Sequence, residues 1–226
     1  MHFARFTLPL HATNKKMKAM KNILITLLML CATLAVSAQN DWEVPDEPTP
    51  TAPVIKENPD QKYLEGAVPV VNGKVVFEKT ILAPGKSADE IYDILLNYTE
   101  RMTRGGNQFE QSRIVMQDTD KHQFVGDFLE WLVFTNRALV LDRTRLRYYL
   151  IVSCADGQAN VKMTRISYLY EEERDPQQYT AEEWITDEEA LNKKHDKLYH
   201  ANGKFRKKTI DRKDFIFNKF EEILNK

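Results

Sequence analysis

Residues 143–153 read RTRLRYYLIVS, and this stretch decides the fold. Arginine stands at every second position as far as Arg147, and Tyr149 continues that row, while leucine, tyrosine and valine hold most of the positions between. Successive side chains of a strand point to opposite faces of a sheet. The period of two therefore predicts a strand with one face on a core and one face toward water.

Other segments with strand character lie on both sides of this stretch. They comprise residues 75–81, 109–118, 122–134 and 160–171, and the central strand itself extends over 139–153. The four segments from residue 109 to residue 171 are joined by short turns such as Asp156-Gly157. Connections this short predict antiparallel neighbours, because parallel strands need a long crossover.

Helices are indicated before and after these strands. Ser87 and Glu90 form a capping box in front of apolar residues at helical spacing, and two more capping boxes begin at Thr180 and Thr186. An apolar stripe predicts a final helix from about Ile210. The whole order predicts an α+β domain: a curved antiparallel sheet of about five strands, with an early helix and a C-terminal helix packed on one face.

The first 38 residues have the features of a secretion signal. Lys18 and Lys21 precede an apolar run over residues 23–35, and small side chains follow as far as Ala38. The run is shorter than the roughly 20 residues of a spanning helix. Because this signal is complete if translation starts at Met17 or Met20, residues 1–16 are interpreted as a misassigned start. We expect an exported protein, periplasmic or secreted, attached to a membrane only if the signal stays uncleaved.

Loss of the signal changes both the charge and the cysteine content. Residues 1–38 hold five basic and no acidic side chains, so residues 39–226 carry 27 basic and 33 acidic ones, a formal charge of −6. Nucleic-acid binding usually needs a basic domain, so none is expected here. Cys154 is the cysteine that remains, which excludes an internal disulfide.

Residues 39–62 contain five of the nine prolines of the chain and few apolar side chains. Such a segment buries too little surface to offset the entropy lost on ordering. It is predicted to be a disordered linker, and the folded domain is predicted to span residues 63–226.

Several runs resemble a known family. They are residues 132–134, 141–145, 183–191 and 203–211, which read LVF, LDRTR, EWITDEEAL and GKFRKKTID. These runs are similar to the exported domain of unknown function with a TATA-binding-protein-like (TBP-like) fold, found in gut-type Gram-negative bacteria. The resemblance covers roughly residues 63–226. It implies a curved antiparallel sheet with helices on one side, and it implies no catalytic residue, cofactor or ligand.

The best candidate surface is the arginine row. Arg143, Arg145 and Arg147 lie on one face of their strand, Tyr149 continues it, and a neighbouring strand can add Lys162 or Arg165. Arginine forks match carboxylates and phosphates, which suggests an anionic ligand or partner. Alternatively the arginines pair with acidic groups of the chain itself, namely Asp127, Glu130 or residues 171–175.

Trp131 completes the candidate surface. Residues 124–141 are apolar on both parities of a strand, so this strand is either covered on both faces or lines a groove. A groove between the sheet and the C-terminal helix would suit an apolar, lipid-like small molecule. Core packing explains the same pattern without a ligand.

Catalytic and metal-binding patterns are weak. His195 and His200 are about 140° apart on a helix, so they predict surface histidines and no metal site. Cys154 reads as a buried small residue, although a reactive thiol is the alternative. The sequence predicts no cofactor and no enzyme. We expect a binding or structural domain of the cell envelope with a protein or apolar small-molecule partner; a hydrolase is the remaining alternative.

Overall fold

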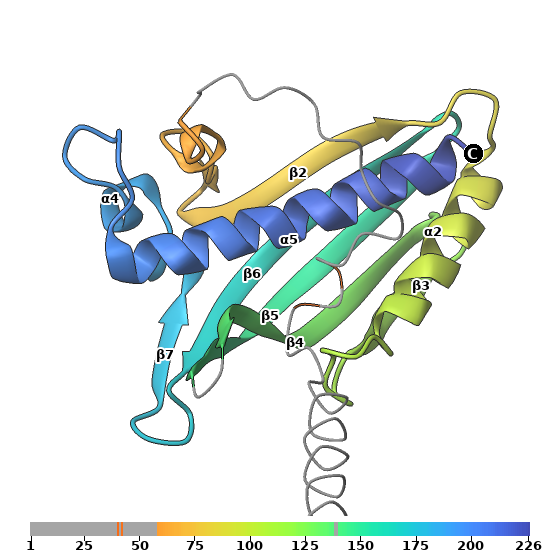
Figure 1. Ribbon diagram of the computed structural model, residues 1–226. Coiled ribbons are helices and arrows are strands. Elements are labelled where there is room, and N and C mark those ends of the chain that lie inside the picture. The colour runs from red at the N-terminus through yellow and green to blue at the C-terminus, as the bar shows by residue number, and fades with distance from the viewer. Residues whose placement is uncertain (1–39, 41, 43–57, 138–139) are drawn as a thin grey trace, which may run out of the picture. The chain divides into compact units, whose positions relative to one another are not determined.

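The computed structural model describes residues 40, 42, 58–137 and 140–226 (Figure 1). The predicted signal over 1–38 and most of the predicted linker lie outside these residues. In chain order the elements are η2 (Gln61–Tyr63), β1 (Val70–Val71), β2 (Lys74–Leu82), α2 (Ala88–Met102), β3 (Arg113–Asp118), β4 (Gln123–Arg137), β5 (Val140–Ala155), β6 (Gln158–Tyr170), β7 (Gln177–Thr180), α3 (Ala181–Trp184), α4 (Asp187–Ala190) and α5 (His200–Leu224). No helix within the described ranges has both the length and the apolar character needed to cross a bilayer.

The strands form one antiparallel sheet of seven strands. Their order is β1-β2-β6-β5-β4-β3, and β7 pairs with β6 beside this path. The predicted α+β class with an antiparallel sheet is confirmed. The sheet exceeds the five predicted strands because β1 has two residues and β7 is a short polar strand, Gln177–Thr180, in a segment that showed no alternation.

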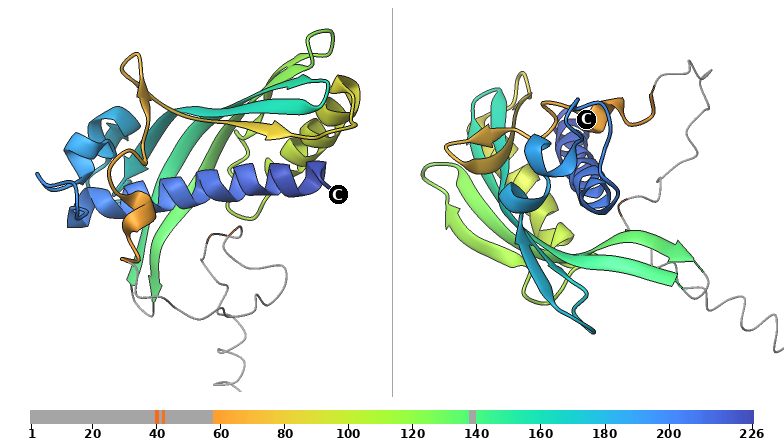
Figure 2. Two further views of the ribbon diagram at one scale, coloured as in Figure 1. Left: turned by 90° about the horizontal axis from the view of Figure 1, so that it is seen from above. Right: turned by 90° about the vertical axis from the view of Figure 1, so that its left-hand side faces the viewer.

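The core lies on one face of this sheet. Leu146, Tyr148, Leu150 and Val152 of β5 are fully buried there, as the alternation predicts. Helices α2 and α5 cover this face, and the views of Figure 2 place both on the same side of the sheet. The prediction that the helices pack on one face is therefore confirmed.

Helix α2 begins where the sequence predicts. The Ser87 side chain accepts a hydrogen bond from the Glu90 N–H (3.3 Å), and the Glu90 carboxylate accepts one from the Ser87 N–H (2.8 Å). This reciprocal capping satisfies two backbone donors that the first turn of a helix leaves unpaired.

Helix α5 begins at His200, ten residues before the predicted start at Ile210. Its first turns carry Gly203 and a basic run, which are poor signals for a buried helix. Gly203 is needed because a Cβ there would lie 2.9 Å from the Cβ of Leu198. Arg206, fully buried, occupies a position where periodicity looks for an apolar residue.

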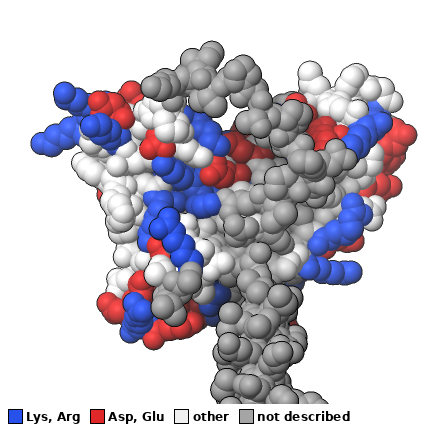
Figure 3. Space-filling model, in the orientation of Figure 1, with Lys and Arg blue, Asp and Glu red and all other residues white. Residues whose placement is uncertain are grey.

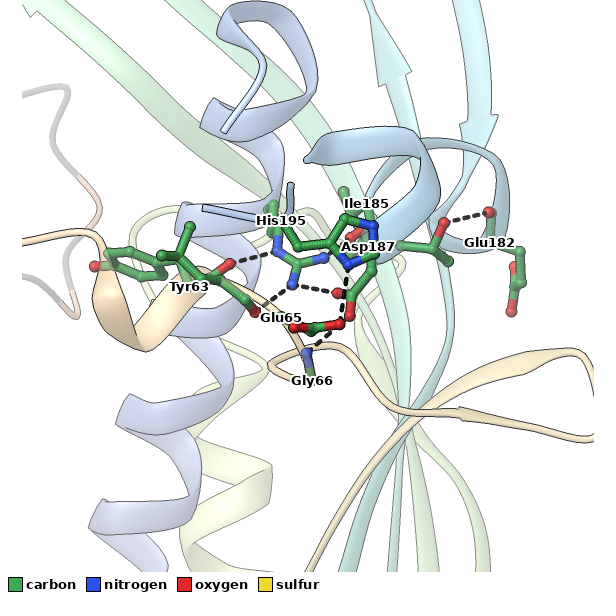
Figure 4. A network of polar contacts seen from close by, with 10 residues as sticks. Tyr63, Glu65, Gly66, Glu182, Ile185, Asp187 and His195 are labelled. Carbon is green, nitrogen blue, oxygen red and sulfur yellow. Dashed lines mark hydrogen bonds and ion pairs between the residues drawn. The ribbon is translucent and has the colours of Figure 1, made fainter. Parts of the chain in front are cut away.

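Arg206 binds four acceptors from two distant parts of the chain (Figure 4). Its guanidinium donates to the carbonyl oxygens of Tyr63 (2.6 Å), Leu64 (2.7 Å) and Ile185 (2.7 Å). It also donates to the carboxylate of Asp187 (2.6 Å). One buried cation therefore ties α5 to the chain around η2 and to the region of α3 and α4.

The acidic groups around Arg206 extend the network. The Gly66 N–H donates to Asp187 (2.8 Å), and the Val75 N–H at the start of β2 donates to Glu182 (2.8 Å). His195 lies 3.1 Å from a carboxylate oxygen of Glu65 (Figure 4). The carboxylates of Asp187 and Glu182 thus accept hydrogen bonds from backbone N–H groups that have no partner in α5.

Strand β4 extends beyond its short neighbour β3, and other segments bind the exposed backbone edge. The Phe109 N–H donates to the Leu129 carbonyl (2.8 Å), and the Trp131 N–H donates to the Asn107 carbonyl (2.9 Å). Asn40 accepts from the Val133 N–H (2.9 Å) and donates to the Val133 carbonyl (3.2 Å). Free edge groups invite pairing with another chain, and these contacts remove that edge.

Within the predicted linker over residues 39–62, the structure describes Asn40, Trp42 and residues 58–62, and the linker as a whole stays a prediction. Asn40 and Trp42 are buried, and residues 58–62 lead into η2. The Trp42 ring lies 5.8 Å from the Phe215 ring and 5.4 Å from the Arg212 guanidinium. Burial of the Trp42 indole and pairing of the Asn40 amide favour the ordering of these two residues.

Replacing Arg206 with methionine tests the role of this cation. The variant Arg206→Met keeps much of the side-chain volume but removes the guanidinium that donates to three carbonyls and to one oxygen of the Asp187 carboxylate. We expect the free energy of unfolding to fall by about 3–5 kcal/mol in urea denaturation. The matched control Lys193→Met removes the same charge from an exposed side chain and should change it by less than about 0.5 kcal/mol. Equal effects of the two variants would contradict this role.

Candidate functional site

The five residues of the predicted surface lie together on the outer face of the sheet, which we define as the face away from α2 and α5. Arg143, Arg145, Arg147 and Tyr149 alternate with buried residues of β5, so they share this face. Trp131 of β4 pairs directly with Arg145, and residues opposite each other in an antiparallel pair point to the same side. We call Arg143, Arg145 and Arg147 the arginine row.

Aromatic rings lie between and beneath these arginines. The Arg143 guanidinium is 3.7 Å from the centroid of the Trp131 ring, and the Arg145 guanidinium is 4.5 Å from that of Phe109. The Phe109 and Trp131 rings are 5.1 Å apart. Each contact has the distance of a cation–π or aromatic interaction, which holds the guanidinium groups above an apolar surface.

Phe109 is a member of this site that sequence reasoning missed. It was expected to open a strand over 109–118, but β3 begins at Arg113 and Phe109 lies in the loop before it. Its N–H binds the Leu129 carbonyl, and this contact places its ring beside Trp131. No periodic signal marks such a position, because the contact joins residues 20 apart in the chain.

Tyr149 connects the arginine row with β6. Its ring lies 5.8 Å from the Arg147 guanidinium and 5.4 Å from the Arg165 guanidinium. The backbone of Arg165 is in the left-handed region (φ 52°). The β5–β6 register shifts beside Tyr149. Lys162, opposite Ile151, binds Glu78 of β2 at 3.2 Å. Of the two basic residues suggested by the sequence, Arg165 therefore joins the row through Tyr149.

Carboxylates of the chain itself pair with the arginine row. Arg147 donates twice to Asp127, at 3.0 and 2.7 Å, and the hydrogen bonds to Asp127 raise the pKa of this guanidinium above its ordinary value. Arg145 binds Glu172, and Arg143 lies 3.8 Å from Glu173. Pairing within the chain was one of the two predicted readings, and Asp127 and residues 171–175 take part as predicted.

Glu130 does not take part, and the prediction that it pairs with the row is wrong. Its position in β4 has the opposite parity, so its side chain lies beneath α5. There it accepts from Arg212 Nε at 2.7 Å, with both side chains buried, and from Gln108 at 2.5 Å. The pair is a second buried cation–carboxylate contact of α5, and its position follows from the two-residue period of a strand.

The connection between β6 and β7 forms an acidic turn, residues 171–175, at the end of the arginine row. It begins with Glu171 in the left-handed region (φ 52°), whose carbonyl accepts from the N–H groups of Arg174 and Asp175 (both 3.0 Å). This closed turn presents Glu172 and Glu173 to Arg145 and Arg143.

Two hollows of about 190 Å³ each lie along the outer face, and Leu169 borders both of them. The first is lined by Trp131, Arg143 and residues of the acidic turn, and the second by Leu129, Arg145, Arg147 and Gln178. On the opposite side of the domain, where α5 lies, basic and acidic residues are intermingled over the described surface (Figure 3).

The groove suggested between Trp131 and the C-terminal helix is not present in this geometry. Trp131 and α5 lie on opposite faces of the sheet, so they cannot line one cavity. Along most of α5 the interface with the sheet is filled by buried side chains, including Phe205, Ile216 and Phe220. At the first turns of α5 a hollow of about 380 Å³ is lined by Phe134, Asp142 and Lys204, so its walls carry charges. A lipid-like ligand along the filled interface would have to displace the buried side chains.

Two other kinds of site were considered in the sequence, a metal site and a reactive thiol. Across 58–137 and 140–226, no group of three or more His, Cys, Asp or Glu side chains could hold a metal ion. Cys154 is buried on the core face and unpaired, and burial raises the pKa of its thiol to about 12.

An open antiparallel sheet with its helices on one face defines an α+β domain. Residues 77–169 match the family described as a domain of unknown function (DUF4468) with TBP-like fold. The chain is 39% identical to a DUF4468 family protein from Bacteroides ovatus ATCC 8483 of known crystal structure, with a TM-score of 0.70. That match covers 75% of this chain and 97% of the other. The chain belongs to the DUF4468 family, which confirms the resemblance seen in its sequence.

A more distant structure agrees on the fold. A TBP-like protein from Parabacteroides distasonis ATCC 8503 is 16% identical, with a TM-score of 0.55, and the match covers 70% of this chain and 96% of that one. At this identity the likeness concerns the fold alone. No curated protein matches the chain.

The reactivity of Cys154 is a direct test of the thiol alternative. Because the thiolate is the reactive form, a raised pKa predicts slow alkylation by iodoacetamide at pH 8, at least 100-fold slower than in urea. The rate for the folded protein should keep rising with pH beyond 9, the ordinary range of a thiol. A rate that levels off below pH 9 would show a reactive cysteine instead.

Proposed function

We propose that this chain is a non-enzymatic binding domain of the cell envelope, exported by the signal in residues 1–38, and that its partner binds the outer face of β4, β5 and β6. The composition of that face supports the proposal. Arginine, tryptophan and tyrosine contribute most to the binding energy of protein interfaces, and here arginines contact Trp131 and Tyr149 on a face that neither α2 nor α5 covers.

The arrangement of the face suits a protein partner. Arg143, Arg145 and Arg147 are between 29% and 52% exposed, so a partner can reach them without a rearrangement of the sheet. Their guanidinium groups are already positioned over aromatic rings, which lowers the entropy lost on binding. Leu129 and Leu169 add apolar surface between the charges.

The charge of the chain favours a polypeptide over a nucleic acid. Residues 39–226 carry a formal charge of −6, whereas nucleic-acid binding domains are as a rule basic. The proposal of a non-enzymatic role is supported by Cys154, whose raised pKa removes the one cysteine of residues 39–226 from nucleophilic chemistry at neutral pH.

A photo-crosslinking amino acid at Gln178 tests the proposed face in the native bacterium. Gln178 is exposed and lines the second hollow, and Asn218 is an exposed amide on α5, on the opposite face. We expect one discrete adduct from position 178 and none from position 218. Trp131→Ala in the same protein should reduce the adduct at least fivefold, because it removes the ring beneath Arg143.

Two results would contradict this proposal. Adducts of equal yield from positions 178 and 218 would show that the outer face is not selective. An adduct from position 178 that is unchanged by Trp131→Ala would show that the predicted residues do not take part in binding.

A further inference from the structure

The carboxylates that now pair with the arginine row differ in how firmly they are held. Asp127 belongs to β4, is 9% exposed and binds Arg147 with both oxygens, so this pair is part of the sheet. Glu173 belongs to the acidic turn, is 85% exposed and lies 3.8 Å from Arg143. Exposed pairs at such distances contribute little to stability because water screens them.

Arg145 is also incompletely satisfied. One terminal nitrogen of its guanidinium binds Glu172, while its Nε is buried and has no hydrogen-bond partner in the described part of the chain. A guanidinium has five donors and binds a carboxylate best through two parallel hydrogen bonds. Arg143 and Arg145 each meet the turn through one terminal nitrogen, so their contacts lack the two parallel hydrogen bonds that a better-placed carboxylate can make.

Space for such a carboxylate lies beside the turn. The first hollow, of about 190 Å³, separates Trp131 and Arg143 from residues of the acidic turn. This volume is about six times that of one water molecule in the liquid. Its walls combine the Arg143 guanidinium, an indole ring and Leu169 with Asp142 and the carboxylates of the turn, so an acidic side chain can enter it only in exchange for those of the turn.

We infer that the outer face binds an acidic polypeptide segment, and that Glu172 and Glu173 occupy its place in the free protein. The inference rests on the proposed function, because it names the partner class of the same face. The acidic turn shows which chemistry the row accepts: successive carboxylates carried on a peptide backbone. Since the turn is tethered beside the row, it competes at high effective concentration and weakens binding of the partner.

Competition makes opposite predictions for the two sides of the contact. The double variant Glu172→Gln and Glu173→Gln removes the competitor and should bind an acidic peptide roughly three- to tenfold more tightly. The double variant Arg143→Gln and Arg145→Gln removes the site and should bind it at least tenfold more weakly. A purely local, structural role of the ion pairs predicts no gain from the first variant.

The peptide used as a probe has the sequence of residues 170–176, YEEERDP, labelled for fluorescence anisotropy and compared with YQQQRNP, an analogue that keeps the arginine but has no side-chain carboxylate. The exported protein is measured at low ionic strength, where ion pairs are least screened. Matched controls change the same charges at exposed residues elsewhere: Glu188→Gln with Glu189→Gln, and Lys193→Gln with Lys194→Gln. These controls should leave the affinity within about twofold of the unchanged protein.

The variants of Glu172 and Glu173 alter a surface turn, so this arm remains informative even if the arginine variants unfold. The inference is overturned if the double variant Glu172→Gln and Glu173→Gln raises the affinity for the peptide no more than the control variant Glu188→Gln and Glu189→Gln does. It is also overturned if an oligothymidine of equal charge binds as tightly as the peptide. A Gln178 adduct that depends on Trp131 but not on the Glu172 and Glu173 charges would reject the acidic partner while retaining the outer face.

Discussion

Strand β5 places successive side chains on opposite faces of the sheet, and its neighbours β4 and β6 must follow the same alternation. Leucine, tyrosine and valine therefore lie under α2 and α5, while the arginine row lies on the face that the helices leave open. A slip of one residue in this register would bury three arginines and expose the core, so the register is strongly specified. The candidate site is a direct consequence of the packing that stabilises the fold.

On the covered face, charges are buried where α5 crosses the sheet. Arg206 binds backbone carbonyls and Asp187, and Arg212 binds Glu130. Burying an ion is unfavourable unless its hydrogen bonds are completed, and both cations have partners at close distance. These contacts fix where α5 lies along the sheet. The outer face differs, since its three arginines are partly exposed and two of their carboxylate partners, Glu172 and Glu173, come from a turn.

Much of this could be predicted from the sequence, because it depends on local patterns. The capping box at Ser87, the alternation of β5 and the common face of the arginine row are set by neighbours within a few residues. Other features depend on contacts between residues far apart in the chain. They are the first turns of α5, the position of Phe109 and the hydrogen bonds between Asn40 and Val133. The charge of Glu130 suggests a pair with the arginine row, but its even-numbered position in β4 places it on the core face beside Arg212.

On the outer face, we propose, the carboxylates of a partner exchange with those of the acidic turn. Nuclear magnetic resonance of ¹⁵N-labelled protein tests this most directly, since the Nε–H groups of Arg143 and Arg145 and the amides of the acidic turn can be followed together. On titration with the acidic peptide, we predict shifts of both arginine signals and of residues 171–175, with the amides of α5 unchanged. Shifts confined to α2 and α5, with the arginine signals unmoved, would contradict the account.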